Sequence, residues 1–237
     1  MCGRFAQYRS MRDYLRELDS EQDAMSVWEG EPIQRYNVAP STQVQVLHST
    51  GGNLVVAEVR WGWAPNWTRG KMPPPINARL EKVATGKFFK QIWQHRALVA
   101  ADGWFEWVQD EDNPKIKQPY YIRLRSGDPL FFAAIGQFPL AGGEASVTDG
   151  FVIITADAEG GMIDVHDRRP VVLSPELARE WVDPDTTAPR AEQILLHQGT
   201  ASWEFEWFPV DRAVGDVRND GPELIRPANE QDQGEKH

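Results

Sequence analysis

The chain has 237 residues, of which 41% are hydrophobic and 25% are charged, which is enough to bury one sizeable core. No apolar run approaches the roughly 18 residues that cross a bilayer, and the chain starts without the apolar segment of a secretory signal, so we expect a cytoplasmic protein. A single cysteine excludes an internal disulfide and disfavours a structural zinc site, and we expect no cofactor.

Charge is distributed unevenly along the chain. The formal net charge is −10, which taken alone disfavours nucleic acid as a partner. From Arg60 to Arg96, however, eight basic residues stand against one acidic residue, Glu81, so this segment carries +7 and the remainder −17. The simpler interpretation of this basic segment is that it forms the solvated face of a helix. The alternative is that it forms a surface that binds an anion.

The first elements follow from local patterns. Apolar residues three and four positions apart predict a helix over 10–19. Alternating polar and apolar residues over 43–48 and 54–61 indicate a hairpin. The proline-rich segment 64–76 has no usable period and is expected to be an exposed loop. The spacing of four aromatic and apolar residues then predicts a helix over 85–95.

The second half of the chain predicts a mixed sheet. Segments rich in aromatic and β-branched residues are expected to be strands, at 97–108, 120–125, 130–137, 151–155 and 203–210. Helices are expected from Ser174, as the N-cap, to about 182 and over 190–197. We infer a single α+β domain, residues 1–227, with a curved, barrel-like mixed β core flanked by short helices, followed by a disordered acidic tail at 228–237.

Cys2 is the first candidate for chemistry because of its position. Most lone cysteines are inert buried residues. Removal of Met1, which a small second residue permits, would place a thiol and an α-amine on one residue. An amine with a pKa of about 8 can attack an aldehyde to give an imine, and the thiol can then close a five-membered thiazolidine. The same terminus could instead attack an amide, with its own amine as the base.

Two residues are candidates for moving protons. Strand alternation places Glu106 on one face with Trp104 and Val108, where desolvation would raise its pKa and suit it to acid–base work. The alternative is an edge-strand glutamate paired with an arginine. His166 is flanked by two acidic and two basic residues that could tune its charge near neutral pH, although a surface ion-pair network would have the same pattern.

Other residues are suited to contacts with DNA. Asn77 and Arg79 point the same way in an extended segment and could hold a sugar oxygen and a phosphate. Arg4 would add a phosphate contact. Trp67, in the exposed loop, could stack on a base for about 1–3 kcal/mol, or it could be a loop anchor.

Five ordered motifs resemble the SOS-response-associated peptidase (SRAP) family. They are MCGRF at Met1, RYNVAP at Arg35, INAR at Ile76, DGWFEW at Asp102 and HDRRP at His166. The resemblance, which runs from Met1 to about Pro227, implies an α+β domain with a barrel-like core. It also implies binding to single-stranded DNA and cross-linking to abasic sites through the N-terminal cysteine as a thiazolidine, which shields the lesion.

The resemblance also implies roles for individual residues. Cys2 would form the cross-link, and Asn77 would position the opened sugar and its phosphate. Glu106 would act as acid and base for ring opening and imine formation, and His166 would handle later proton transfers, including reversal. Positions that line the family's DNA groove are matched by Arg4, Asn37, Pro40, Trp67, Arg79 and Thr155.

The loop departs from the family pattern, because many bacterial members carry two adjacent tryptophans where this chain has Asn66-Trp67 and a longer stretch over 68–75. The implied partner is single-stranded DNA with abasic sites, including DNA at replication forks, bound by a monomer that joins the nucleoid at damage. Three alternatives stay open: an N-terminal cysteine hydrolase such as a glutamine amidotransferase, a peptidase whose expected cut is the release of Met1, and a non-covalent single-strand binder.

Overall fold

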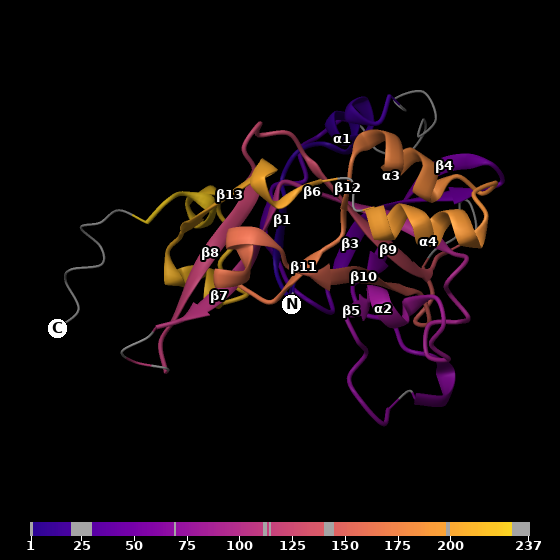
Figure 1. Ribbon diagram of the computed structural model, residues 1–237, viewed down its shortest axis with the longest axis horizontal. Coiled ribbons are helices and arrows are strands. Elements are labelled where there is room, and N and C mark those ends of the chain that lie inside the picture. The colour runs from indigo at the N-terminus through magenta and orange to yellow at the C-terminus, as the bar shows by residue number, and fades with distance from the viewer. Residues whose placement is uncertain are drawn as a thin grey trace.

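The chain forms two β-sheets, with helices packed outside the larger one (Figure 1). The computed structural model describes residues 2–19, 30–68, 70–110, 113, 115–139, 145–197 and 200–228. Strand order is β13-β8-β7-β1-β2 in the small sheet and β11-β10-β9-β6-β3-β4 in the large sheet, with β12 on β9 and β5 on β10. The α+β class is therefore confirmed.

The bounds of the elements are as follows. The small sheet contains β1 (Phe5–Gln7), β2 (Arg35–Val38), β7 (Gly103–Gln109), β8 (Lys117–Leu124) and β13 (Phe205–Pro209). The large sheet contains β3 (Gln43–Thr50), β4 (Asn53–Arg60), β5 (Asn77–Arg79), β6 (Arg96–Ala101), β9 (Leu130–Gln137), β10 (Gly150–Asp157), β11 (Arg168–Pro170) and β12 (Val172–Leu173). The helices are α1 (Met11–Glu17), α2 (Leu80–Val83), α3 (Pro175–Val182) and α4 (Ala188–His197).

The large sheet curls, but the strands described do not close it into a barrel. Trp61, directly after β4, makes an isolated parallel bridge to Phe151 of β10, and the Gly62 N–H donates to the Phe151 carbonyl at 2.8 Å. A single bridge joins these edges where a closed barrel would have a full ladder. The expected barrel-like core is thus an open, curled sheet facing a second sheet.

Hydrophobic residues form three clusters. One lies between the two sheets and includes Cys2, Trp61 and Trp104. A second lies outside the large sheet, where α1, α3 and α4 cover it, and a third lies outside the small sheet. Gln7, which is fully buried, ties the sheets together because its side-chain amide donates to the Gln45 carbonyl at 3.0 Å and to the Ala100 carbonyl at 2.9 Å.

Several predicted elements are confirmed at close to their expected bounds. Ser10 caps α1 in a capping box with Asp13, and Ser174 caps α3. The predicted hairpin turns at Gly51 and Gly52, whose positive φ values of 60° and 83° glycine adopts without strain.

Two predicted elements are wrong. The segment 85–95, which was expected to be a helix, is a run of turns that follows the short α2. Within it the Ile92 N–H donates to the Phe89 carbonyl. Helix α2 ends at Val83, and the Gly86 N–H donates to the Lys82 carbonyl at 2.8 Å, where a side chain on Gly86 would come within 2.6 Å of that oxygen. The strand expected over 97–108 is two strands, β6 and β7, in different sheets and separated at Asp102.

Asp102 makes the corner between the two sheets. Its carboxylate accepts hydrogen bonds from the Tyr8 N–H at 2.7 Å and the Tyr14 hydroxyl at 2.6 Å, and it pairs with Arg9 Nε at 2.8 Å. A buried carboxylate needs such partners, and these tie the corner to the start of the chain. The corner therefore holds β1 next to β7.

Within the described ranges no helix is both long and apolar enough to span a membrane. The expected acidic tail from residue 229 onward lies outside the described residues.

The close approach of β10 to the end of β4 predicts a strong effect of Gly150→Ala. A Cβ there would lie 2.4 Å from the Gly62 carbonyl oxygen and 3.1 Å from that of Arg60, and both are backbone atoms. We expect a loss of about 1–3 kcal/mol in the free energy of unfolding, which lowers the melting temperature by about 2–4 °C per kcal/mol. Gly215→Ala is the control, because nothing lies within 4 Å of its Cβ position. Equal melting temperatures for the two variants would contradict the tight contact.

Candidate active site

Cys2 lies fully buried between the two sheets, ahead of β1. Strand β1 pairs with β2 on one side and with β7 on the other, which fixes the start of the chain in the small sheet. From the large sheet, the side-chain amide of Asn77 donates to the Cys2 carbonyl oxygen at 2.7 Å. The first residues are thus held from both sheets.

Asn77 is positioned by the edge of β10. It is the first residue of β5, which pairs in parallel with β10 so that Asn77 lies opposite Ile153 and Arg79 opposite Thr155. The preceding carbonyl, of Ile76, accepts hydrogen bonds from both Trp61 Nε1 and the Ile153 N–H. Asn77 Oδ1 is buried and accepts no hydrogen bond from the part of the chain that the structure describes. An acceptor is therefore available beside Cys2.

Glu106 is buried on β7, with 3% of its surface exposed. As the alternation predicts, Trp104 and Val108 belong to the cluster between the sheets, while Phe105 and Trp107 pack on the other side. Burial raises the pKa of Glu106 to about 7. A carboxyl group with this pKa exchanges its proton readily near neutral pH.

His166 follows a 3-10 turn, Gly160–Asp164, and lies with its Nε2 3.9 Å from Glu106 Oε2. Its Nδ1 lies 2.9 Å from the Arg168 N–H and 2.7 Å from Asp167 Oδ1. Neutral Nδ1 can accept from the Arg168 N–H, whereas protonated Nδ1 can donate to Asp167. Burial lowers the pKa of His166, which favours the neutral ring.

The environment of Cys2 keeps its thiol protonated. Desolvation raises the pKa of the thiol, and the negative charge of Glu106 raises it further. The thiolate is the strong nucleophile, so a buried thiol needs a base that takes its proton. Glu106 is within electrostatic reach of the thiol and ionises in the required pH range.

Arg168 locks the two halves of the site together, which the sequence reasoning missed. Its guanidinium donates to Glu81 of α2 at 2.8 and 3.2 Å, to Asp157, and to the Thr155 carbonyl at 2.6 Å. Helix α2 follows β5 directly, so the residue that contacts the His166 ring through its N–H also anchors the segment that carries Asn77. The partners lie up to 87 residues apart, so no local pattern reveals them.

The residues predicted to line a DNA groove differ in their exposure to solvent. Arg79 and Trp67 are exposed, Trp67 by 62%, and Pro40 is partly buried. Thr155 is fully buried, and its Oγ1 forms no hydrogen bond within the described ranges. The Trp67 ring packs edge-on against Phe88 at 5.8 Å, which orients the loop while leaving most of the indole open to solvent.

Arg4 and Asn37 contact each other and the C-terminal segment. Arg4 Nη1 donates to Asn37 Oδ1 at 2.7 Å and to the Val214 carbonyl at 3.0 Å. The Asn37 side-chain amide donates to three carbonyl groups, of Val214, Asp216 and Asn219. These two residues therefore hold the segment after β13 against the small sheet.

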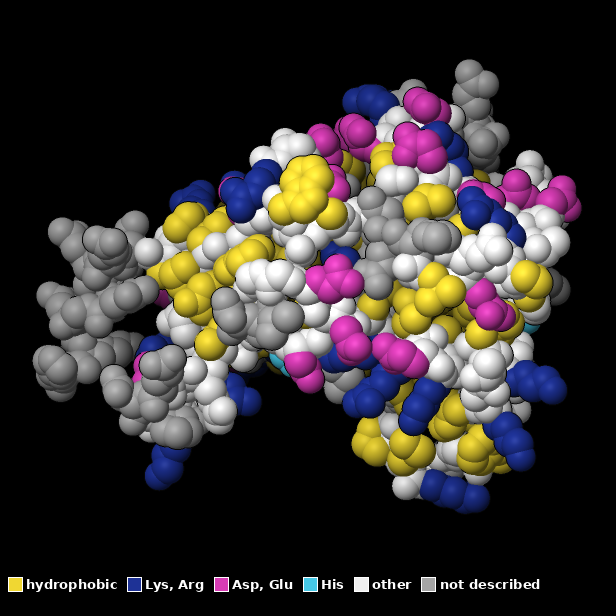
Figure 2. All heavy atoms as spheres, in the orientation of Figure 1, with side chains coloured by type: hydrophobic (Ala, Val, Ile, Leu, Met, Phe, Trp, Pro, Cys, Tyr) yellow, Lys and Arg dark blue, Asp and Glu magenta, His cyan; other side chains and the backbone are white. Residues whose placement is uncertain are grey.

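The basic segment from Arg60 to Arg96 is only partly one surface. Figure 2 shows basic side chains around the lobe below α2, which the loop after β4 forms. Arg96 is not among them, because it is 7% exposed and donates to the carbonyl groups of Trp181, Asp183 and Thr186. The prediction of a basic surface thus holds for the lobe and fails for Arg96.

Comparison with known proteins identifies a family. Residues 1–217 match the SOS response associated peptidase (SRAP) family. Abasic site processing protein YedK of Escherichia coli is 46% identical over 228 residues, 96% of this chain and 100% of that protein. Abasic site processing protein YoqW of Bacillus subtilis is 33% identical over 229 residues, 95% of this chain and 99% of that protein.

A solved structure is similar to this chain in both sequence and fold. A phage-related protein from Bordetella bronchiseptica, 41% identical, has a TM-score of 0.74 and covers 89% of this chain and 95% of its own. The fold described above is therefore one already seen in a similar protein.

The raised pKa of Glu106 predicts a pH-dependent stability difference between the wild type and Glu106→Gln. The folded state binds this proton more tightly than the unfolded state, in which the pKa is 4.5, so wild-type stability falls as the pH rises from about 4.5 to about 7. Glutamine has no charge to bury, so urea denaturation should show the variant gaining up to about 3 kcal/mol over the wild type across that range. A difference that is the same at pH 4.5 and pH 8 would contradict this.

Proposed function

Because the chain belongs to the SOS response associated peptidase family, we propose that it captures abasic sites in single-stranded DNA as a covalent thiazolidine on Cys2. The observation that carries the proposal is the joint burial of Cys2 and Glu106 next to Asn77, between the two sheets. The names of the relatives in E. coli and B. subtilis, abasic site processing proteins, support the choice of substrate.

The reaction begins once Met1 has been removed. The α-amine of Cys2 attacks the C1′ aldehyde of the ring-opened abasic sugar, and loss of one water gives an imine. The thiol then adds to the imine carbon, its proton is transferred to the nitrogen, and the five-membered ring closes. Holding both nucleophiles on one residue makes the second step intramolecular. The net change joins protein and DNA with the loss of one water.

Glu106 is the proton carrier in this scheme. As a carboxylic acid it donates to the departing oxygen, and as a carboxylate it takes the proton of the thiol. Its pKa of about 7 leaves both forms populated near neutral pH. His166, with Nε2 3.9 Å from the carboxylate, exchanges protons with it in later steps and in reversal.

Asn77 orients the first residue and the sugar. Its Nδ2 holds the Cys2 carbonyl, and its Oδ1 is the acceptor for the α-amine or for a sugar hydroxyl. Arg79 is exposed two residues along the same strand and is suited to the adjoining phosphate. Trp67 offers an open ring face for stacking on a base.

The first expected outcome concerns the adduct itself. Single-stranded DNA with one abasic site should give a product that survives SDS and heat, and intact DNA should give none. Intact mass spectrometry should report the protein without Met1, plus the DNA, minus one water. Cys2→Ala should give no heat-stable product, although borohydride should still trap an imine on its α-amine. A stable adduct on Cys2→Ala, or on a protein that retains Met1, would contradict the proposal.

The second expected outcome concerns Glu106. Glu106→Gln should slow adduct formation by about 10²–10⁴, which is the usual contribution of a general acid or base. Glu58→Gln, at an exposed position of β4, is the matched control and should react at the wild-type rate. Single-turnover rates measured by gel shift check both. A wild-type rate of adduct formation for Glu106→Gln would show that this residue takes no part in the mechanism. Glutaminase activity without adducts would favour the hydrolase alternative.

A further inference from the structure

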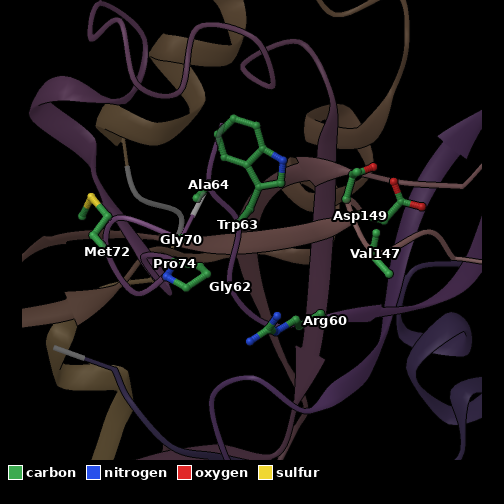
Figure 3. Close-up of a pocket in the computed structure, with 10 residues that line it drawn as sticks. Arg60, Gly62, Trp63, Ala64, Gly70, Met72, Pro74, Val147 and Asp149 are labelled. Carbon is green, nitrogen blue, oxygen red and sulfur yellow. The ribbon is translucent and has the colours of Figure 1, made fainter. Parts of the chain in front are cut away.

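A pocket of about 330 Å³ opens between the loop after β4 and the turn before β10 (Figure 3). Its walls combine apolar and polar groups. The residues that line it include Arg60, Gly62, Trp63, Met72, Val147 and Asp149. The reactions described above use none of them.

Trp63 presents a hydrogen-bond donor without an acceptor. The residue is 2% exposed, and its Nε1 is buried and donates to no group in the described ranges. Its ring packs against Phe88 and Phe89. In Figure 3 the nitrogen lies on the edge of the ring nearer Asp149. Buried donors in proteins are nearly always paired, so this one points to an acceptor that the chain does not supply.

Two opposite charges line the same pocket without pairing with each other. Asp149 is 8% exposed, and its carboxylate is held by the Ser146 N–H at 2.8 Å and by the Gln137 amide at 3.1 Å. Arg60 is exposed and forms no ion pair with the residues that the structure describes. The interior therefore offers a fixed acceptor, and the mouth offers a cation.

The pocket lies close to the segment that carries Asn77 of the candidate active site. Gly62 contacts Phe151, and Asn77 lies opposite Ile153 on the same strand, so two residues of β10, about 7 Å, separate the two contacts. The loop that forms one wall, with Met72, also carries Trp67. A strand whose abasic sugar lies at Asn77 would bring a neighbouring nucleotide to the pocket.

We propose that this pocket holds the nucleobase of a nucleotide next to the abasic residue. A ring or amino N–H of the base would donate to Asp149, a ring nitrogen or carbonyl would accept from Trp63 Nε1, and Arg60 would pair with the attached phosphate. A phosphate in the interior would be repelled by Asp149, whereas a neutral flat ring fits between the apolar walls. The inference rests on the proposed function, because it assumes that the strand passes Asn77.

The test is a base-deletion scan by equilibrium binding. The probes are single-stranded oligonucleotides with a central tetrahydrofuran, an abasic analogue that has no aldehyde, and with a second tetrahydrofuran replacing one flanking base at a time. At one flanking position, removal of the base should weaken wild-type binding about tenfold, as should Trp63→Phe with the base present. Once that base is removed, Trp63→Phe should bind as tightly as the wild type.

Two variants guard against an effect of misfolding. Asp149→Asn should weaken binding only while the base is present, and Arg60→Gln, at an exposed position, should weaken binding while leaving the melting temperature unchanged. Trp203→Phe, on a residue 75% exposed, is the matched control and should bind like the wild type. The proposal would be overturned if the effects of Trp63→Phe and Asp149→Asn on binding were the same whichever flanking base is removed. It would also be overturned if neither variant changed binding with any probe. Because the probes cannot react, failure of the covalent chemistry would appear separately, as wild-type protein that forms no adduct with a true abasic site.

Discussion

Burial of a carboxyl group and a thiol in one enclosed space is the constraint on which the rest of the structure depends. Glu106 comes from the small sheet, Asn77 from a strand on the edge of the large sheet, and Cys2 from the chain start held between them. Neither sheet alone could remove these groups from water. Desolvation raises the pKa values of Glu106 and of the thiol, and the negative charge of Glu106 raises the pKa of the thiol further. The thiol therefore stays protonated near neutral pH, and Glu106 is the group that gains or loses a proton there.

Much of this site follows from local rules of the sequence. Alternation along β7 assigns Glu106 to the face of Trp104, and alternation along β5 separates Asn77 and Arg79 from the buried Ala78. Pro and Ser signals also located α3. These predictions succeed because each depends only on neighbouring residues in an extended strand or in the first turn of a helix.

Other features depend on contacts between distant segments, which periodicity does not report. The helical spacing over 85–95 is real, but helix α2 already ends at Val83, and the aromatic residues reach the core from a series of turns. The resemblance assigned Arg4 and Asn37 to a DNA groove, and in this structure they hold a segment more than 170 residues away. The lock between Arg168 and Glu81 likewise exists only after the sheets have formed.

The two fixed points on β10 have a consequence for how this fold can diversify. Gly62 and Asn77 are both tied to that strand, one by a hydrogen bond and the other by strand pairing, so the intervening chain leaves and returns at anchored positions. Insertions or deletions between them cost little, because the closure entropy of a loop grows slowly with its length. The reactive end of the scaffold can therefore stay constant while the intervening segment is exchanged, which would let one chemistry serve nucleic acids of different shapes.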